Sequence, residues 1–248
     1  MIELLRPDWP APPGVVAFST TRRGGVSQGC YAEANLAGHV GDDAAAVQSN
    51  RNALRQQLPG RPRLAWLEQV HGIAVVAAAS EGSPSADAQW TATPGLACMV
   101  LTADCLPVLL CDHRGRRVAA AHAGWRGLAQ GVLEQTVAAL GLPADQLLAW
   151  LGPAIGPDAF EVGPEVRQAF LQGPGDATRL REAFTPGRDG RWQADLYQLA
   201  RVRLHRLGLH RIHGGGWCTA TEPRTFYSWR RDGSTGRQAT GIYLLPGR

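Results

Sequence analysis

The segment TADCLPVLLCDHRGRRVAAAHAGW contains two apolar runs separated by a short polar stretch. The runs are Leu106–Leu110 and Val118–Ala121, and the stretch between them includes a glycine. Two apolar runs joined by so short a connection predict a pair of adjacent antiparallel strands. A cysteine, Cys105, and a histidine, His122, stand just outside the runs, at the open end of this hairpin.

The loop length decides which residues of the hairpin face each other. With a four-residue loop over 112–115, Cys105 faces His122. Opposite residues of an antiparallel pair point to the same side, with Cβ atoms about 4.5–5.5 Å apart. Zinc binds cysteine sulfur at about 2.3 Å and histidine nitrogen at about 2.0 Å, so these two side chains could share one ion. A shift of one residue would separate them, and Pro107 interrupts the regular strand here.

His71 is the predicted third ligand. It stands in the sequence EQVHG, where a predicted strand meets a glycine and a side chain can be directed into a cleft. Two histidines and one cysteine leave one tetrahedral position of zinc open, as in catalytic sites, where the metal lowers the pKa of water toward about 7. The alternative reading of the residues alone is that Cys105 and His122 are packing residues at strand ends.

Apolar periodicity predicts the remaining elements. The predicted strands are Val15–Thr20, Leu64–Val70, Ile73–Ala78, Leu96–Leu101, Gln146–Gly152 and Gln238–Leu245. The predicted helices are Ala44–Leu58, capped by Asp42 and Asp43, a stripe from Leu128 to Leu140, Pro164–Leu171, and Asp195–Leu207, capped by Asp195. This order predicts an α/β fold of mixed sheets with hairpins, flanked by helices in layers, as a single domain over residues 1–248. We expect the Gly/Pro-rich segment Gln172–Asp176 to be a surface loop.

Composition excludes several classes of protein. No apolar stretch is long enough to span a bilayer, and the acidic, proline-rich start does not resemble a signal peptide, so we expect a cytoplasmic protein.

Five cysteines without a CxxC pair argue against a disulfide framework, and Cys98 and Cys111 are expected in the core. All 25 basic residues are arginine, which excludes a Walker A loop and Schiff-base chemistry. The arginines are scattered, so we expect no nucleic-acid partner.

Several motifs together resemble one known family. They are STTRRGGVS, HVGDD, WLEQVHG, TADCLPVLL, AAAHAGWRGL, LGPAIGPDAFEVG and CTATEPRTFYSWRRDGSTGR, and they follow one another from about Thr20 to the C-terminus. In this the chain is similar to the YfiH-type family, first called multicopper polyphenol oxidoreductases or laccase-domain proteins. The resemblance implies an α/β fold and a metal held by His71, Cys105 and His122, with zinc as the expected ion and copper as the alternative.

The resemblance also implies an activity. Its members are described as purine nucleoside phosphorylases, acting on adenosine, inosine, guanosine and methylthioadenosine, with adenosine deaminase activity. We therefore expect a purine nucleoside and phosphate as partners, and a monomer or homodimer. Phosphate would be bound by arginine side chains, for which Arg22, Arg126 and Arg230 are the candidates, with Arg231 as an alternative to Arg230. Asp104 is a candidate acid or base, and Asn35 and Gln69 are candidate substrate contacts.

Two alternative activities remain. A cysteine hydrolase would use Cys105 as nucleophile and His122 as base, and bacterial relatives are linked to removal of a wrong amino acid from a peptidoglycan precursor. A copper-dependent polyphenol oxidase, or laccase, would use the same ligands, because two histidines and a cysteine also suit copper. Multicopper centres need many histidines, often as HxH, and this sequence contains no HxH.

Overall fold

The computed structural model describes residues 1–173 and 176–247, and its two larger sheets form the centre of the molecule. The first sheet has the order β1-β2-β14-β6-β3 and is antiparallel except between β6 and β3. Its strands are β1 (Leu4–Leu5), β2 (Val15–Thr20), β14 (Gln238–Leu244), β6 (Leu96–Thr102) and β3 (Arg63–Ala65). The closing strand of the chain therefore pairs with two strands from its first half.

The second sheet carries the predicted hairpin at its centre. Its order is β13-β9-β7-β8-β5-β4, with parallel pairs at both edges and antiparallel pairs between them. Its strands are β13 (Arg211–Gly214), β9 (Leu147–Leu151), β7 (Leu106–Asp112), β8 (Val118–Ala123), β5 (Ala88–Thr91) and β4 (Val75–Ala77). A small antiparallel sheet is formed by β10 (Glu161–Val162), β12 (Trp192–Ala194) and β11 (Phe184–Pro186).

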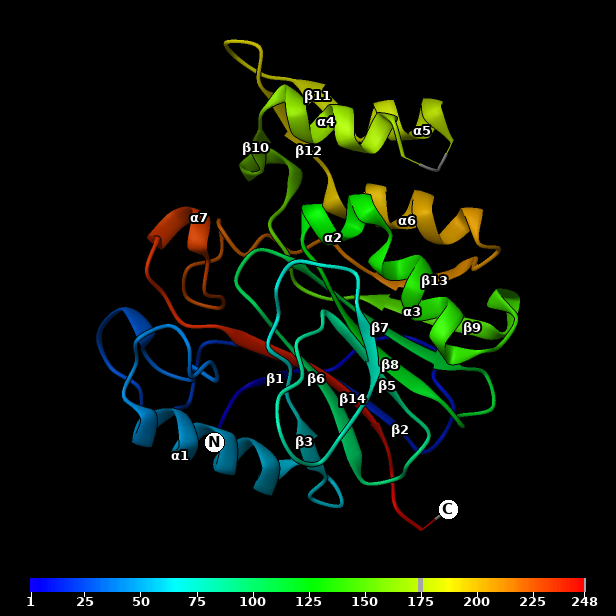
Figure 1. Ribbon diagram of the computed structural model, residues 1–248. Helices are drawn as coiled ribbons and strands as arrows, with labels where there is room; N and C mark the ends of the chain where they lie inside the picture. Colours follow the sequence, from blue (N-terminus) through cyan, green and yellow to red (C-terminus); the bar gives the residue numbers. More distant parts are fainter. Residues whose placement is uncertain (174–175, 248) are drawn as a thin grey trace.

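The described residues form seven α-helices. They are α1 (Ala44–Gln57), α2 (Trp125–Gln130), α3 (Val132–Leu140), α4 (Pro164–Leu171), α5 (Ala177–Glu182), α6 (Leu196–Arg206) and α7 (Trp229–Asp232), with 3-10 turns at Gly29–Tyr31, Ala144–Gln146 and Pro157–Ala159. Figure 1 shows α1 at the lower left, α3 near mid-height on the right, and α4, α5 and α6 above it, with α4 and α5 beside the small sheet.

Three buried clusters correspond to the spaces between layers. Alternate residues of the first sheet, such as Met99 and Tyr243, pack against Leu54 of α1. The other face of the first sheet packs against the second sheet and forms a cluster between them. The outer face of the second sheet forms the third cluster with α2, α3 and α6. The order is therefore helix, sheet, sheet and helices, because each strand of period two offers one apolar face to each neighbouring layer. The predicted α/β fold of mixed sheets flanked by helices is confirmed.

Several predicted elements match closely, and others are wrong. Strand Val15–Thr20 and helix Pro164–Leu171 have the predicted bounds, and Asp43 and Asp195 cap their helices as expected. Asp42, also predicted as a cap, instead accepts a hydrogen bond from the Asn35 amide. The stripe from Leu128 to Leu140 is two helices instead of one, because Gly131 adopts a left-handed conformation with φ 109° between them. The predicted strands Leu64–Val70 and Ile73–Ala78 shrink to β3 and β4, because the chain between them turns toward the cavity described below. Of the loop predicted at 172–176, residues 174–175 lie outside the described part of the chain.

The register of the hairpin differs from the prediction by two residues. His122 pairs with Pro107, and Cys111 pairs with Val118. The loop is 113–116, because Asp112 remains in the strand: its N–H donates to the Arg117 carbonyl at 3.2 Å, and its carboxylate accepts from two backbone N–H groups at the turn. A two-residue shift preserves which face each side chain takes, so Cys105 and His122 still lie on the same side.

Candidate metal centre and its cavity

Three potential metal ligands converge at one edge of the two-sheet sandwich. His71 comes from the segment between β3 and β4, Cys105 directly precedes β7, and His122 lies near the end of β8. One ligand atom from each lies within 4.8 Å of the others. The Cys105 Sγ and His71 Nε2 atoms are 3.9 Å apart, and the two imidazole rings meet edge to face with centroids 4.8 Å apart. The three residues named from the sequence are therefore brought together.

Asp87 holds two of these ligands in place. It directly precedes β5 and stands opposite His122, whose N–H donates to the Asp87 carbonyl at 2.7 Å. The buried Asp87 carboxylate is 2.8 Å from His122 Nδ1, which leaves Nε2 for a metal. The same carboxylate accepts from the backbone N–H groups of His71 at 3.0 Å and Gly72 at 2.6 Å. One carboxylate thus orients an imidazole directly and the second ligand through its backbone.

The backbone around the ligands is shaped for close approach. His71 adopts the left-handed region with φ 61°, which is uncommon for a residue other than glycine. Gly124 follows β8, and a Cβ atom there would lie 3.0 Å from Cys105 Sγ and 3.1 Å from His71 Cδ2. A side chain at this position would therefore enter the space shared by the three ligands.

The charges within the site favour a thiolate. Burial opposes ionisation of the Cys105 thiol, but the neighbouring His122 imidazolium and hydrogen bonds from both histidines lower its pKa to about 6. Burial likewise opposes the charge on His122, yet Cys105 and Asp87 raise its pKa to about 9. Burial opposes ionisation of Asp87 too, but the hydrogen bond with His122 and those from Gly72 and His71 hold its pKa below the usual value. These charges therefore favour the deprotonated form of Cys105, which is the form that binds a metal.

The donor set and spacing fit a metal ion. Ligand atoms of a tetrahedral zinc ion stand about 3.5 Å apart, close to the 3.9 Å found between Cys105 and His71. Nitrogen and sulfur donors suit zinc or copper, and three ligands leave a fourth position. The space beside Gly124, which has no Cβ, lies against all three side chains. His71, Cys105 and His122 could therefore hold a metal ion with one position open.

The three ligands line a cavity of about 400 Å³, within the range of small-molecule sites. Its floor consists of buried residues, namely Leu101, Thr102, Ala103, His122, Ile155 and Phe160. Its rim carries exposed side chains, namely His39, His71, Arg126, Trp229 and Arg230. Trp125 and Arg237 are half-buried in its wall. The cavity thus combines an apolar floor, aromatic walls and arginines beside the candidate metal centre.

Four of the other residues named from the sequence line this cavity. Gln69 does so with its side-chain amide paired to the backbone N–H and carbonyl of Leu101, both at 2.8 Å. Asp104 accepts hydrogen bonds from the Thr219 hydroxyl at 2.6 Å and the Arg230 N–H at 2.7 Å. Arg126 and Arg230 reach the rim from α2 and α7. Asp104 therefore fixes the first turn of α7, which presents Arg230.

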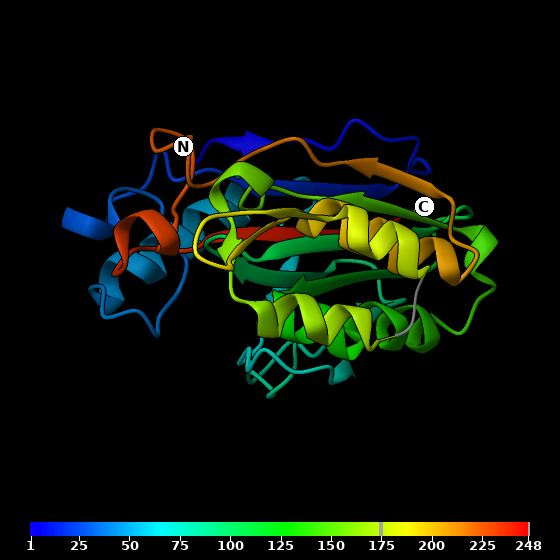
Figure 2. The same ribbon diagram turned by 90° about the horizontal axis from the view of Figure 1, so that it is seen from above.

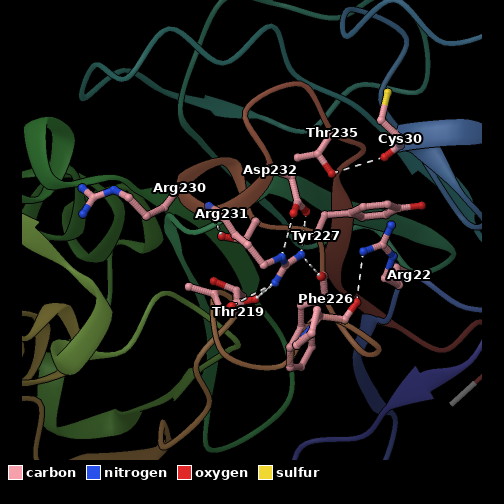
Figure 3. Close-up of polar contacts among 12 residues, drawn as sticks. Arg22, Cys30, Thr219, Phe226, Tyr227, Arg230, Arg231, Asp232 and Thr235 are labelled. Carbon is pink, nitrogen blue, oxygen red and sulfur yellow. Dashed lines mark hydrogen bonds and ion pairs between the residues drawn. The ribbon is translucent and has the colours of Figure 1, made fainter.

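Arg22, Arg231 and Asn35 do not line the cavity. Arg22 donates to the carbonyls of Ala32 and Pro223 and stacks on Tyr227. Figure 3 shows Arg231 surrounded by its hydrogen-bond partners, whereas Arg230 extends away from this group. Asn35 is fully buried, and its side chain binds backbone groups of residue 37 and of the segment before β14. Arg22 and Asn35 join the loop of residues 22–37 to the segment of residues 223–237, and Arg231 braces that segment from within. Figure 2 shows the two stretches side by side, in blue and in orange to red.

Sequence reasoning missed several residues of the site. Asp87 and Arg237 come from distant segments, and only Asp87 carries a local signal, since it precedes a short strand. The Arg237 guanidinium donates to the carbonyls of residues 235 and 236. Burial lowers the pKa of Arg237, and the negative charges of Cys105 and Asp104 partly offset this effect. Arg237 therefore supplies a guanidinium to the cavity wall, whereas Arg22, the arginine predicted from the sequence, does not line the cavity.

None of the helices in the described part of the chain is long and apolar enough to cross a membrane. Residues 16–245 match the family model described as multi-copper polyphenol oxidoreductase laccase. A purine nucleoside phosphorylase from Pseudomonas aeruginosa is 56% identical over 241 residues, covering 97% of this chain and 98% of the relative. The purine nucleoside phosphorylase YfiH of Escherichia coli is 51% identical over 249 residues, covering 99% and 100%.

Solved structures give the same assignment. A crystal structure of a Neisseria meningitidis protein superposes with a TM-score of 0.92 at 50% identity, covering 98% of this chain and 99% of the other. YlmD from Geobacillus stearothermophilus gives a TM-score of 0.88 at 30% identity, covering 98% and 96%. With a family match over nearly all of its length and relatives above 50% identity, this chain belongs to the multi-copper polyphenol oxidoreductase laccase family, which is the YfiH-type family.

Proposed function

We propose that this protein is a zinc-dependent purine nucleoside phosphorylase. The carrying observation is that three side chains that could hold a metal ion, His71, Cys105 and His122, face a cavity that also holds three arginines. The relatives that are 56% and 51% identical are named purine nucleoside phosphorylases, which supports this assignment. Adenosine, inosine, guanosine and methylthioadenosine are the proposed substrates, and phosphate is the second substrate.

The walls of the cavity suit the parts of these substrates. A purine ring would pack against Trp125, Phe160 or Trp229, since flat aromatic faces stack favourably. Phosphate would be bound by Arg126, Arg230 and Arg237, because guanidinium groups bind its oxygens in pairs. Positioned there, the arginines would hold the nucleophile beside a sugar that acquires positive charge.

A divalent ion held by the three ligands would supply Lewis-acid chemistry and would lower the pKa of a nearby water molecule. We propose zinc as the ion and adenosine deamination as a second activity of the same cavity, since deamination needs an activated water. Asp87 would keep His122 and His71 oriented during turnover. Asp104 would hold Arg230, and any acid or base role of Asp104 would use an oxygen that already accepts a hydrogen bond.

The test combines metal analysis with an assay of inosine cleavage. We expect hypoxanthine release that requires phosphate, and about one zinc per chain. His71→Ala, Cys105→Ala and His122→Ala should each lose both zinc and turnover. His113→Ala and Cys30→Ala remove exposed residues outside the cavity and should retain both. Hypoxanthine release without phosphate, or wild-type turnover in a ligand variant, would refute the proposal.

A cysteine hydrolase is the second candidate. The feature in its favour is that Cys105 and His122 lie together and shift each other's pKa toward the ionised thiolate–imidazolium pair that thiol nucleophiles use. The expected substrate is an amide bond in a peptidoglycan precursor. Activity that survives chelation, is lost in Cys105→Ser and releases an amino acid from such a precursor would favour this candidate over phosphorolysis.

Polyphenol oxidation is disfavoured by the ligand count. Among residues 1–173 and 176–247, the three ligands form the single group of three or more His, Cys, Asp or Glu side chains close enough to share an ion. One such group binds one ion, whereas multicopper chemistry needs several. Copper in place of zinc at this one site is tested by reconstituting the metal-free protein with each ion and assaying inosine and a polyphenol in parallel.

A further inference from the structure

The His39 imidazole is an ionisable group of the cavity to which no task has yet been assigned. His39 lies in the turn before α1, its side chain is exposed, and it lines the same cavity as the three candidate metal ligands. In the described part of the chain, the imidazole rings that form hydrogen bonds are those of His71, His113 and His122. Both ring nitrogens of His39 are therefore available to a bound molecule.

The other ionisable side chains that line the cavity are engaged elsewhere. Three of them are the candidate metal ligands. Both carboxylate oxygens of Asp104 accept hydrogen bonds, one from the Thr219 hydroxyl and one from the Arg230 N–H. The arginine side chains keep their protons at neutral pH. Among the described residues of the cavity, His39 is therefore the one that can take up a proton without giving up a metal or a hydrogen bond.

The surroundings of His39 favour its neutral form. Burial lowers the pKa of His39 below its usual value, and the positive charges of Arg237 and Arg51 lower it further. Arg51 is held in place, because it donates to the Leu36 carbonyl at 2.9 Å and stacks on Trp66. A neutral imidazole has one nitrogen that donates a hydrogen bond and one that can accept a proton.

Arg237 links His39 to the proposed phosphate site. Its guanidinium is half-buried in the cavity wall and donates through Nη1 alone to the carbonyls of residues 235 and 236, so within the described residues Nε and Nη2 remain for a ligand. Its charge acts on His39 on one side and on Cys105 and Asp104 on the other. A phosphate bound by Arg237 would therefore lie in the space that His39 borders. Hydrogen phosphate still carries a proton, which an imidazole can accept and an arginine cannot.

We propose that His39 is the catalytic base that accepts the proton of hydrogen phosphate during cleavage of the nucleoside. This inference rests on the proposed phosphorylase function. As a phosphate oxygen bonds to C1′ of the ribose, the C1′–N9 bond breaks and its electron pair stays on the purine. The phosphate proton passes to His39, and the imidazolium then gives it to the purine. The products are ribose 1-phosphate and a neutral purine, and the imidazole is neutral again.

The test compares single turnovers of inosine in wild type and His39→Gln, with the hydrogen phosphate dianion saturating at every pH. Glutamine can form hydrogen bonds but cannot take up a proton, so the rate should fall about hundredfold. The wild-type rate should also decline on the acidic side, with an apparent pKa below the usual histidine value of 6.5, and His39→Gln should lack this decline. A wild-type rate in His39→Gln overturns the proposal, as does a variant whose only defect is a higher KM for phosphate, or one in which the acidic decline persists unchanged.

His210→Gln is the matched control. His210 is exposed, lies outside the cavity, and contacts the ring of His205 without a hydrogen bond among the described residues. This variant should keep the wild-type rate and its acidic decline. Zinc content and melting temperature should match wild type in both variants, and a loss of either in His39→Gln would overturn the proposal in favour of a structural role. A wild-type protein that releases no hypoxanthine, or needs no phosphate, refutes the phosphorylase function itself, whereas a phosphate-dependent wild type with an unaffected His39→Gln refutes this inference alone.

Discussion

Replacement of Asp87 by asparagine tests how the candidate metal centre is held together. The carboxylate is fully buried and has four neighbouring donors: His122 Nδ1 and the His71 N–H share Oδ1, and the Gly72 and Val70 N–H groups share Oδ2. The amide of asparagine has the same shape but offers a single acceptor oxygen. Its NH₂ group must therefore face two of these donors, which lose their partner.

The magnitude follows from this count. Each buried donor left without an acceptor costs about 1–3 kcal/mol, so Asp87→Asn should lower the free energy of unfolding of the metal-free protein by about 2–6 kcal/mol. The pKa of Asp87 is lowered in the folded protein, so its contribution to stability is present above the ordinary Asp pKa of about 3.9 and is lost as pH falls below it. Metal affinity should fall about 10- to 100-fold, because a neutral amide oxygen holds the His122 imidazole more weakly than the carboxylate does and the segment around His71 loses part of its support.

The assay is urea denaturation of the metal-free protein together with zinc competition titration of the folded variant. Asp112→Asn is the matched control, since Asp112 is a fully buried carboxylate in the same sheet that accepts from Arg116 and Arg117 at the hairpin turn, away from the metal centre. It should lose stability with wild-type zinc affinity. If Asp87→Asn binds zinc as tightly as wild type, the orienting role assigned to Asp87 is wrong.

The same geometry leads to four further predictions. In the metal-free protein, Cys105 should be alkylated with an apparent pKa near 6, and His122→Gln should shift this upward; a profile centred near the ordinary thiol value of 9.0 in wild type would contradict the ion pair. As pH rises from about 6.5 to 9, the raised pKa of His122 removes stability and the lowered pKa of Cys105 adds a similar amount. The melting temperature of the metal-free protein should therefore be nearly constant over this range, and a steep slope would contradict the ion pair. Gly124→Ala should fold but bind zinc at least tenfold more weakly by competition titration, since its Cβ would crowd Cys105 and His71; unchanged affinity would mean that the space is not needed. Arg237→Gln should raise the KM for phosphate roughly ten- to hundredfold, with Arg22→Gln near wild type, and the reverse order would restore Arg22 as the phosphate ligand.

The sequence alone identified the features that depend on short-range patterns. The apolar runs around the turn predicted the central hairpin, and their period of two placed Cys105 and His122 on one face even though the predicted register was two residues off. Asp43 and Asp195 were identified as helix caps because a cap acts within three residues of its own position. Such patterns repeat every two to four residues and can be read locally.

Only the tertiary structure decided the features that join distant segments. Asp87 meets His122 because β5 pairs with β8, and Arg237 reaches the cavity because β14 closes the first sheet between β2 and β6. Arg22 looked equally suitable as a phosphate ligand until its guanidinium was found bound to two carbonyls. A charged side chain carries no local sign of the groups that will surround it, since those groups are brought together only when the strands pair and the loops pack.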